Sequence, residues 1–178
     1  MNIYGKNVVL RAITMNDTDL LVRLINDPET AKMVGGCSFP VSIEGQQKWI
    51  AAQVGRTDIL RCIVTLKDDE ETGLGTVILS DIDYQNGVAQ VHIKMDKEIG
   101  CGRGYGSDAL NAVVDYAFNE MRLNCIYADV LSYNEISQKL FEKNGFIRDG
   151  ILRSRVYKNG NYVDVYSYSK VKGDMNAK

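Results

Sequence analysis

Apolar and polar residues recur along this chain with two different periods, and these periods predict its elements. Short apolar or alternating runs predict strands at residues 8–12, 59–66, 74–83, 88–96, 125–131, 151–158 and 162–171. Apolar residues at helical spacing predict helices at residues 14–26, 42–54, 110–121 and 134–144. The first is expected to end at Asp27-Pro28, the second to bury Ile43, Trp49 and Ile50, and the last to end at Gly145 as its C-cap. The predicted order is therefore β-α-α-β-β-β-α-β-α-β-β.

Turn signals and connection lengths indicate how these strands pair, and thereby the fold class. Asn86-Gly87 and Asn159-Gly160 are typical of tight hairpins, so the strands on either side of each pair are expected to be antiparallel. A helical crossover places strand 88–96 parallel to strand 125–131. We expect a mixed α/β sheet that binds its ligand where the strand connections diverge. One domain over residues 1–171 and a frayed tail over 172–178 are expected.

Composition excludes several classes of protein. The 178 residues are 45% hydrophobic and 25% charged, as in an ordinary globular domain. A net charge of -2 argues against nucleic-acid binding, and the absence of a long apolar run argues against a membrane span. Cys37, Cys62, Cys101 and Cys125 are scattered and His92 is the single histidine, which predicts neither a metal site nor a disulfide framework. Reduced thiols fit a cytoplasmic protein.

The strongest chemical signal is a run of glycines at positions 100, 102, 104 and 106, between a predicted strand and an amphipathic helix. Glycine lets several backbone N–H groups point at one place, and the helix N-terminus adds its dipole. This arrangement predicts a phosphate or pyrophosphate pocket, with a merely flexible loop as the alternative. A dinucleotide fingerprint does not fit, because Ser107 occupies the third glycine position counted from Gly102, and the G-x-x-x-x-G-K-[ST] motif is absent.

The residues of this loop carry a family resemblance. Residues 102–110 (GRGYGSDAL) resemble the acetyl-CoA loop of the GNAT superfamily of N-acetyltransferases. The later signatures of that superfamily are matched by Asn134-x-x-Ser137-x-Lys139-x-Phe141-x-Lys143-x-Gly145-Phe146 and by Gly150-x-x-Arg153. Gly160-x-Tyr162-x-Asp164-x-Tyr166 is similar to the branch that acetylates ribosomal-protein N-termini, and to its unassigned relatives. The resemblance covers nearly the whole chain and implies a splayed central sheet and acetyl transfer from acetyl-CoA to an amine.

The resemblance also implies which residues hold the cofactor. They are Ile93, Lys94, Met95, Cys101, Gly102, Arg103, Gly104, Tyr105, Gly106, Ser107, Asn134 and Lys139. The pantetheine arm is expected between the two parallel strands, with a main-chain N–H of residues 93–95 polarising the thioester carbonyl. Cys101 stands where the family usually has Gln or Arg, so the backbone amides and the helix end are expected to bind the pyrophosphate. Arg103 adds a charge-assisted contact or is simply solvated.

The catalytic residues depart from the common pattern. Phe141 stands where many members have a tyrosine and cannot donate a proton, so Ser137 is the expected partner of the departing thiolate, with Tyr133 a weaker alternative. Asn134 is expected to cap its helix and to contact the cofactor. The family often has a glutamate at the position of Gln90, and His92 on the same strand face is the candidate base. Glu98 and a relayed water remain alternatives.

Amine chemistry narrows the acceptor. An α-amine titrates near about 7.7–8.0 and a lysine-type amine near about 10.4, so a site without an evident carboxylate base favours the α-amine of a peptide or amino acid. A small-metabolite amine or an amino sugar is the alternative. Specificity is expected in loop 34–40. Phe39 of this loop and Trp49 are candidates to line an acceptor pocket, with core packing the favoured alternative for Trp49. The alternative function is that of a catalytically silent acyl-CoA sensor, and the alternative ligand of the loop is another phosphate-containing cofactor. A homodimer is the candidate assembly.

Overall fold

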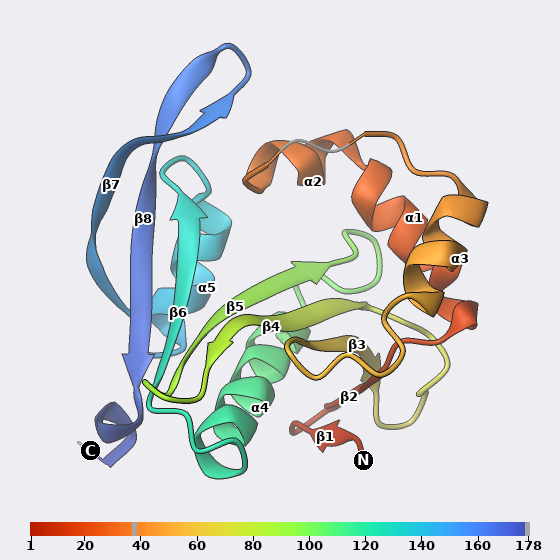
Figure 1. Cartoon of the computed structure of the whole chain (residues 1–178), viewed down its shortest axis with the longest axis horizontal. Helices are drawn as coiled ribbons and strands as arrows, with labels where there is room; N and C mark the ends of the chain where they lie inside the picture. The colour runs from red at the N-terminus through yellow and green to blue at the C-terminus, as the bar shows by residue number, and fades with distance from the viewer. Residues whose placement is uncertain (37–38, 177–178) are drawn as a thin grey trace.

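The computed structural model describes residues 1–36 and 39–176 (Figure 1). Its strands are β1 (Ile3–Tyr4), β2 (Val8–Ala12), β3 (Leu60–Leu66), β4 (Gly75–Asp83), β5 (Val88–Met95), β6 (Cys125–Leu131), β7 (Ile147–Lys158) and β8 (Asn161–Val171). Its α-helices are α1 (Thr18–Asn26), α2 (Pro28–Met33), α3 (Ile43–Ala51), α4 (Tyr105–Asn119) and α5 (Glu135–Lys143). Two short 3-10 helices are η1 (Met15–Asp17) and η2 (Lys172–Asn176). None of the helices in these two ranges combines the length and the apolarity that a membrane span requires.

The described strands form one mixed sheet in the order β1-β2-β3-β4-β5-β6-β8-β7. Strands β5 and β6 are parallel, as the crossover predicts, and the other neighbouring strands are antiparallel. The parallel pairing covers only Val88–Gln90 against Cys125–Tyr127. Beyond these residues β5 and β6 separate, which confirms the splayed sheet and leaves alternate backbone groups on the facing edges without strand partners (Figure 1).

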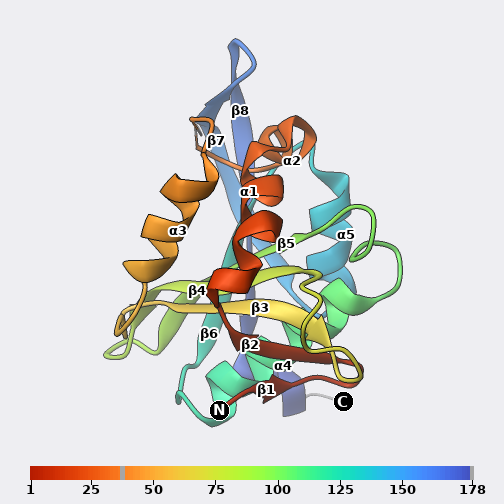
Figure 2. The same cartoon turned by 90° about the vertical axis from the view of Figure 1, so that its right-hand side faces the viewer.

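Helices cover both faces of the sheet. Helix α4 lies below the sheet, whereas α1 and α3 lie above β3 and β4 (Figure 2). The apolar stripe of α4 is buried because its members recur at helical spacing; they are Ala109, Leu110, Ala112, Val113, Val114, Ala117 and Phe118. Each fully buried large side chain contributes about 1.5–3 kcal/mol to folding. This packing fixes the start of α4, and with it the glycine loop, against the end of β5.

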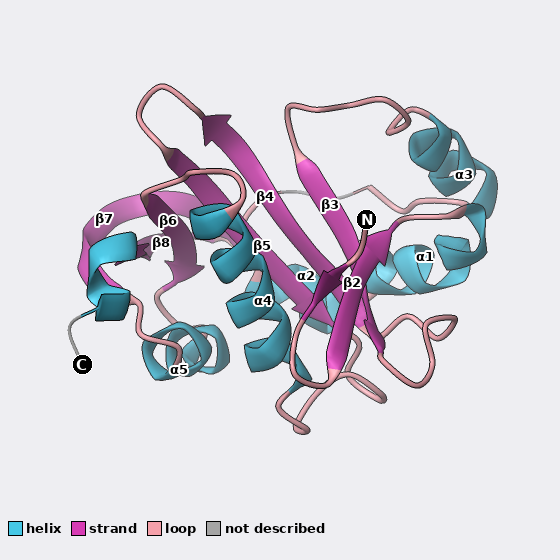
Figure 3. Cartoon of the chain, turned by 90° about the horizontal axis from the view of Figure 1, so that it is seen from below, coloured by secondary structure: helices cyan, strands magenta, loops and turns pink. Residues whose placement is uncertain are grey.

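Helix α5 lies beside α4 on the same side of the sheet (Figure 3). Asn144, which ends α5, joins the two helices: its Oδ1 accepts from Asn111 Nδ2 at 2.8 Å, and its Nδ2 donates to Ser107 Oγ at 3.0 Å. The predicted glycine C-cap is supported by Gly145, which has a φ of +81°. Helix α5 is therefore positioned directly by residues of the first turns of α4.

Three expectations about the first half of the chain are wrong. The expected helix 14–26 begins as the 3-10 turn η1, and a helix at Pro28–Met33 was not expected at all. Proline is favoured at the first helical position, where Asp27 Oδ2 accepts from Thr30 N at 2.8 Å, so Pro28 starts a helix as well as ending the previous one. In α3 only Ile50 is buried as expected, while Ile43 is 50% exposed and Trp49 38% exposed.

The expected fraying of residues 172–178 is wrong over Lys172–Asn176, which form η2. Lys172 Nζ donates to the backbone oxygen of Phe118 at 2.7 Å, and Asp174 Oδ2 accepts from Val171 N at 3.1 Å. The first bond fixes the turn to the end of α4, and the second closes the turn on the end of β8. Residues 177–178 lie outside the described part of the chain.

Candidate functional site

The loop between β5 and α4 presents an unusual row of free backbone amides. Gly102 and Gly104 have φ values of +77° and +81°, a conformation that favours glycine, and Gly104 is the N-cap of α4. Within residues 1–36 and 39–176, no protein acceptor takes the N–H groups of residues 101–107. Unpaired amides at the N-terminus of a 15-residue helix form a site for an anion such as a pyrophosphate.

The end of β5 is held in place below this loop. Gly100 N donates to Asp96 O at 2.9 Å, and a Cβ at Gly100 would lie 2.4 Å from Leu74 O, so a larger residue does not fit. The buried Asp96 carboxylate binds Arg23 of α1 at 2.7 Å and accepts from Glu98 N at 2.9 Å. Burial raises the pKa of Asp96, but the hydrogen bonds from Arg23 and the backbone outweigh it and hold the pKa below its ordinary value.

A cleft of about 710 Å³ opens where β5 and β6 separate, and we call it the central cleft. Its walls come from β3 to β8, the loop after α2, and α5. The lining side chains used below are those of Arg61, Ser80, Gln90, His92, Lys94, Asp129, Asn134, Ser137, Phe141 and Arg155. The cleft joins the unpaired edge of β5 to the candidate catalytic residues of α5.

The structure places the expected cofactor residues in three different settings. Ile93, Lys94 and Asn134 line the central cleft, and Met95 packs against the core next to it. Residues 101–107 form the loop described above. Lys139 points to solvent and pairs with Glu135 at 3.4 Å, away from the cleft lining.

Side chains of the loop contribute less than its backbone. Ser107 Oγ is already an acceptor for Asn144 Nδ2, and Tyr105 is half-buried against the core. Cys101 is exposed, with its Sγ 4.0 Å from Met95 O, and Arg103 is exposed. The direct part these residues and Lys139 play in cofactor binding stays a prediction.

Asn134 and Ser137 lie together at the start of α5. Asn134 Oδ1 accepts from Ser137 N at 3.1 Å, which confirms the expected helix cap, and its Nδ2 donates to Met33 O at 2.9 Å. In the described residues the Ser137 hydroxyl has no hydrogen-bond partner, and it faces the central cleft. Phe141, one turn later, is buried against Phe146 with ring centroids 5.0 Å apart, so this position serves packing.

His92 is part of a polar chain that reaches a strained residue. Ser80 Oγ lies 2.8 Å from His92 Nε2 and 3.0 Å from Asp81 Oδ2. Asp81 has a φ of +50° and lies at an irregularity in the pairing of β4 with β5. Partial burial lowers the pKa of His92, although Asp81 and Asp129 act to raise it, so the imidazole is neutral at neutral pH.

Gln90 shares the strand face of His92, as expected, and its Nε2 lies 3.4 Å from Asp129 Oδ2 of β6. Glu98 is exposed in the turn after β5 and does not line the cleft. Tyr133 donates its hydroxyl to Lys32 O and so joins the turn before α5 to α2. Of the candidate proton-transfer residues, the structure therefore brings His92 and Ser137 into the same cleft.

Several residues of the site escaped the sequence reasoning. Ser80 and Asp81 meet His92 only through the pairing of β4 with β5, and Arg61 reaches the cleft from β3. Asp129 had a usable signal, because it is an exposed acid between the buried Ala128 and Val130 on a strand.

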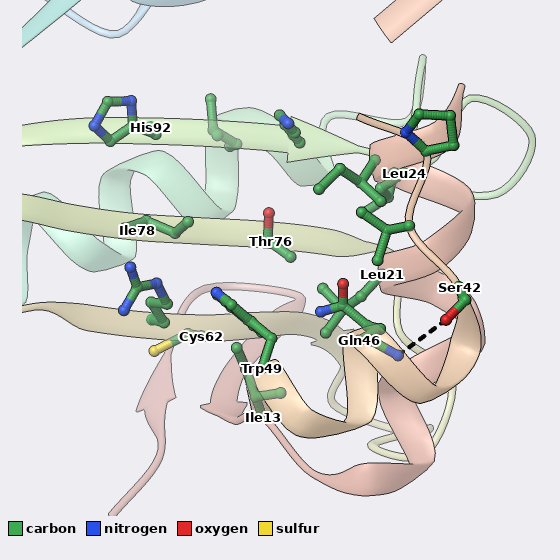
Figure 4. Close-up of a pocket in the computed structure, with 17 residues that line it drawn as sticks. Ile13, Leu21, Leu24, Ser42, Gln46, Trp49, Cys62, Thr76, Ile78 and His92 are labelled. Atoms are coloured by element: carbon green, nitrogen blue, oxygen red, sulfur yellow. Dashed lines mark hydrogen bonds between the residues drawn. The ribbon is translucent and has the colours of Figure 1, made fainter. Parts of the chain in front are cut away.

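A second cavity, of about 650 Å³, lies between helices α1 and α3 and the strands β3 to β5, and we call it the apolar cavity (Figure 4). Trp49 lines this cavity instead of being buried in the core, and Phe39 is 84% exposed. Of the expected specificity loop, Val34 and Gly35 line the central cleft and Pro40 lines the apolar cavity. Residues 37–38 of that loop lie outside the described residues.

Comparison with known proteins agrees with this geometry. The model of the acetyltransferase (GNAT) domain matches residues 7–147, which is most of the chain. The chain belongs to the GNAT acetyltransferase family. It is therefore an acetyl-CoA-dependent acetyltransferase.

Relatives extend over nearly its full length. An uncharacterized N-acetyltransferase p20 of Bacillus licheniformis is 28% identical over 184 residues, covering 96% of both chains. The spermidine N-acetyltransferase of Vibrio cholerae, solved with CoA and spermine, superposes with a TM-score of 0.87 at 23% identity and covers 97% of this chain and 99% of its own. RimL, a ribosomal alpha-N-protein acetyltransferase solved with coenzyme A, superposes with a TM-score of 0.83 at 18% identity, covering 96% and 98%. These two structures support the fold.

Proposed function

We propose that this acetyltransferase acetylates the α-amine of an amino acid or peptide by direct attack, with donor and acceptor bound together. The observation that carries the proposal is the set of free amides at residues 101–107, located beside the central cleft that holds His92 and Ser137. A neutral histidine suits an amine that must lose a proton before it attacks.

The residues present fit acetyl-CoA. The amides of residues 101–107 and the N-terminus of α4 would hold its diphosphate, and the unpaired edge of β5 at residues 93–95 would hold its pantetheine arm. Bound there, the cofactor supplies an activated acetyl thioester. A main-chain N–H of residues 93–95 would be the group that stabilises negative charge on the thioester carbonyl oxygen.

Two side chains act on the reacting groups in this proposal, one by accepting a proton and one by donating a hydrogen bond. His92 accepts a proton from the incoming amine, and Ser80 and Asp81 orient its ring and favour its charged form. Ser137, in the first turn of α5, would donate a hydrogen bond to the sulfur of the leaving group. Asn134 positions Ser137 because it caps that turn.

Replacing Ser137 tests its role. Ser137→Ala removes the hydroxyl and leaves the backbone N–H that Asn134 accepts, so we expect kcat to fall about 100-fold. The affinity for acetyl-CoA should stay the same in calorimetry, because its binding depends on backbone amides. An unchanged kcat in a single-turnover assay would remove Ser137 from the chemistry.

The activity itself is tested with a panel of amines. Calorimetry with acetyl-CoA is followed by measuring free thiol released in the presence of amino acids, peptides, amino sugars and polyamines. We expect acetyl-CoA binding and thiol release with α-amines. Binding without turnover on any amine would instead identify a silent acyl-CoA sensor, and displacement of acetyl-CoA by nucleotides alone would point to another cofactor.

The partner surface points to a second copy of the chain. We propose a homodimer formed along β7, which pairs only with β8 in the described sheet and is 12 residues long. Exposed apolar side chains gather on this hairpin; they are Ile147, Ile151, Leu152, Tyr157 and Tyr162. A long apolar edge strand exposes unpaired backbone N–H and C=O groups that tend to pair with another strand. The same strand of a second copy supplies matching hydrogen-bond partners. Membership of the ribosomal-protein branch stays a prediction.

A further inference from the structure

The apolar cavity and the central cleft meet at one row of side chains. Arg61 of β3 is paired with Ile78 of β4, and Ile78 is paired with His92 of β5. These three residues line both cavities, as do Ile93 and Lys94. Neighbouring strands are about 4.8 Å apart, so the Cα atoms of Arg61 and His92 are about 10 Å apart on the same face. A small molecule with its amine at His92 therefore extends toward Arg61.

The apolar cavity is built for an uncharged, water-avoiding group. Apolar side chains from α1, α3 and the loops beside them point into it toward β3 and β4 (Figure 4). They are Ile13, Leu21, Leu24, Ile25, Val41 and Trp49. Among the described residues that line this cavity, none is an Asp or a Glu. Burying an aliphatic or aromatic group here removes apolar surface from water on both sides.

The two charged residues of this lining are cations without an acidic partner. Arg61 Nη1 donates to Gln53 Oε1 at 2.7 Å, and its guanidinium lies 5.3 Å from the centre of the Trp49 ring. In the described part of the chain neither Arg61 nor Lys94 forms an ion pair, since Asp58 is taken by Arg56. Burial lowers the pKa of both groups. Partly desolvated cations of this kind favour an anionic ligand.

We propose that the acceptor is an α-amino acid with a free carboxylate and a bulky apolar side chain. This inference rests on the proposed function. The amine lies at His92, the carboxylate binds Arg61 and Lys94, and the side chain fills the apolar cavity. A polyamine fits poorly, because its further ammonium groups would lie near Arg61 and Lys94, which repel them. The lining of the apolar cavity has no carboxylate to pair with those groups.

Matched acceptors test the charge requirement. Initial rates are measured for L-leucine, L-leucinamide and spermidine, and we expect kcat/KM for leucine to exceed that for leucinamide about 10-fold or more. Leucinamide has the less basic amine, and thus more free amine at neutral pH, so a preference for leucine has to come from its carboxylate. L-alanine should be acetylated more slowly than L-leucine, because its methyl group leaves the apolar cavity empty.

A pair of arginine variants tests whether the preference for leucine over leucinamide depends on Arg61. Arg61→Gln should reduce the leucine-to-leucinamide ratio toward one while leaving the affinity for acetyl-CoA unchanged in calorimetry. Arg56→Gln is the control, because Arg56 is an exposed neighbour that pairs with Asp58 and lines neither cavity. A melting curve for each variant shows that it is folded.

The outcomes separate this inference from the proposed function. Equal or faster acetylation of leucinamide, spermidine or peptides, with Arg61→Gln unable to change the ratio, overturns the amino-acid assignment and leaves the acetyltransferase activity standing. Thiol release with no amine of the wider panel overturns the proposed function as well. A leucine preference that disappears in Arg61→Gln and persists in Arg56→Gln supports the inference.

Discussion

Ser80 carries a single hydroxyl proton between two acceptors, Asp81 and His92. If the proton lies toward Asp81, His92 Nε2–H donates to Ser80 and the ring leaves Nδ1 free to accept a proton. Asp81, with its strained φ of +50°, lies at the irregularity in β4, and its carboxylate accepts from Ser80 at 3.0 Å. The three residues thus hold the imidazole in one orientation and help it to carry a positive charge.

The pH dependence of the rate follows from the pKa of His92. Because that pKa is below 6.5, the ring is neutral at neutral pH and loses its capacity to accept a proton only as the pH falls below 6.5. We expect kcat/KM to fall on this acid limb. His92→Gln should lower kcat/KM about 100-fold and abolish the limb, as pH profiles of the two proteins would measure.

Ser80 is the positioning residue that provides the control. Ser80→Ala removes the link to Asp81, which makes the imidazolium less stable, so the acid limb should move to lower pH while most of the rate is kept. A His92→Gln protein that retains both the rate and the limb would transfer the base role to Glu98 or to a water.

At the scale of elements, the glycine loop and α4 act as one unit, and two glycines allow a matched comparison. Gly104 and Gly160 have φ values of +81° and +85°, and an added Cβ would meet nothing within 4 Å at either position. Alanine in this conformation costs about 1–2 kcal/mol of stability, which urea unfolding should show for both variants. Only Gly104→Ala should also weaken acetyl-CoA binding, about 10-fold in calorimetry. Gly104 lies within the loop, so a change of its backbone conformation reorients the N–H groups of residues 101–107.

The comparison of Gly104→Ala with Gly160→Ala separates binding from folding. Gly160 lies in the β7–β8 hairpin, away from the loop, so its variant reports the cost of backbone strain alone. Equal affinities for acetyl-CoA in the two variants would show that the N–H groups of the loop do not bind the diphosphate of acetyl-CoA.

The elements that depend on local pattern were predictable from the sequence. Strand β6 and the α4 stripe follow directly from apolar spacing, and the Asn134 cap was anticipated from its place before an amphipathic stretch. The sequence does not predict helix α2, because Asp27-Pro28 indicates the end of the preceding helix, although proline is also favoured at a helix start. Ile43 and Trp49 were placed in the core because helical spacing does not show that a cavity adjoins α3.

The candidate site divides in the same way between local and distant determinants. The free amides of the loop were foreseen, since glycine spacing between a strand and a helix is a local signal. The contacts of His92 with Ser80, and the row that brings Arg61 toward it, depend on the register of three strands. Register is fixed by long-range pairing, so one sequence does not reveal these neighbours.

At the scale of the whole molecule, one sheet carries the cofactor loop, the central cleft and the proposed partner surface. Arg155 and Val156 of β7 line the central cleft, while the apolar edge of the same strand faces outward. A partner seated along β7 would therefore restrain one wall of the cleft. Dimer formation and acceptor binding are expected to be coupled through this strand.

The dimer is tested by placing a charge on that edge. Sedimentation of the native protein should give twice the mass of the chain, and Ile151→Lys should give the mass of a single chain, because a buried lysine without a partner opposes association. Val54→Lys changes an exposed apolar residue in the turn after α3, away from β7, and should remain dimeric. A native protein that sediments as a single chain at every concentration would show that β7 is left uncovered, and an Ile151→Lys protein that stays dimeric would place the interface on another surface.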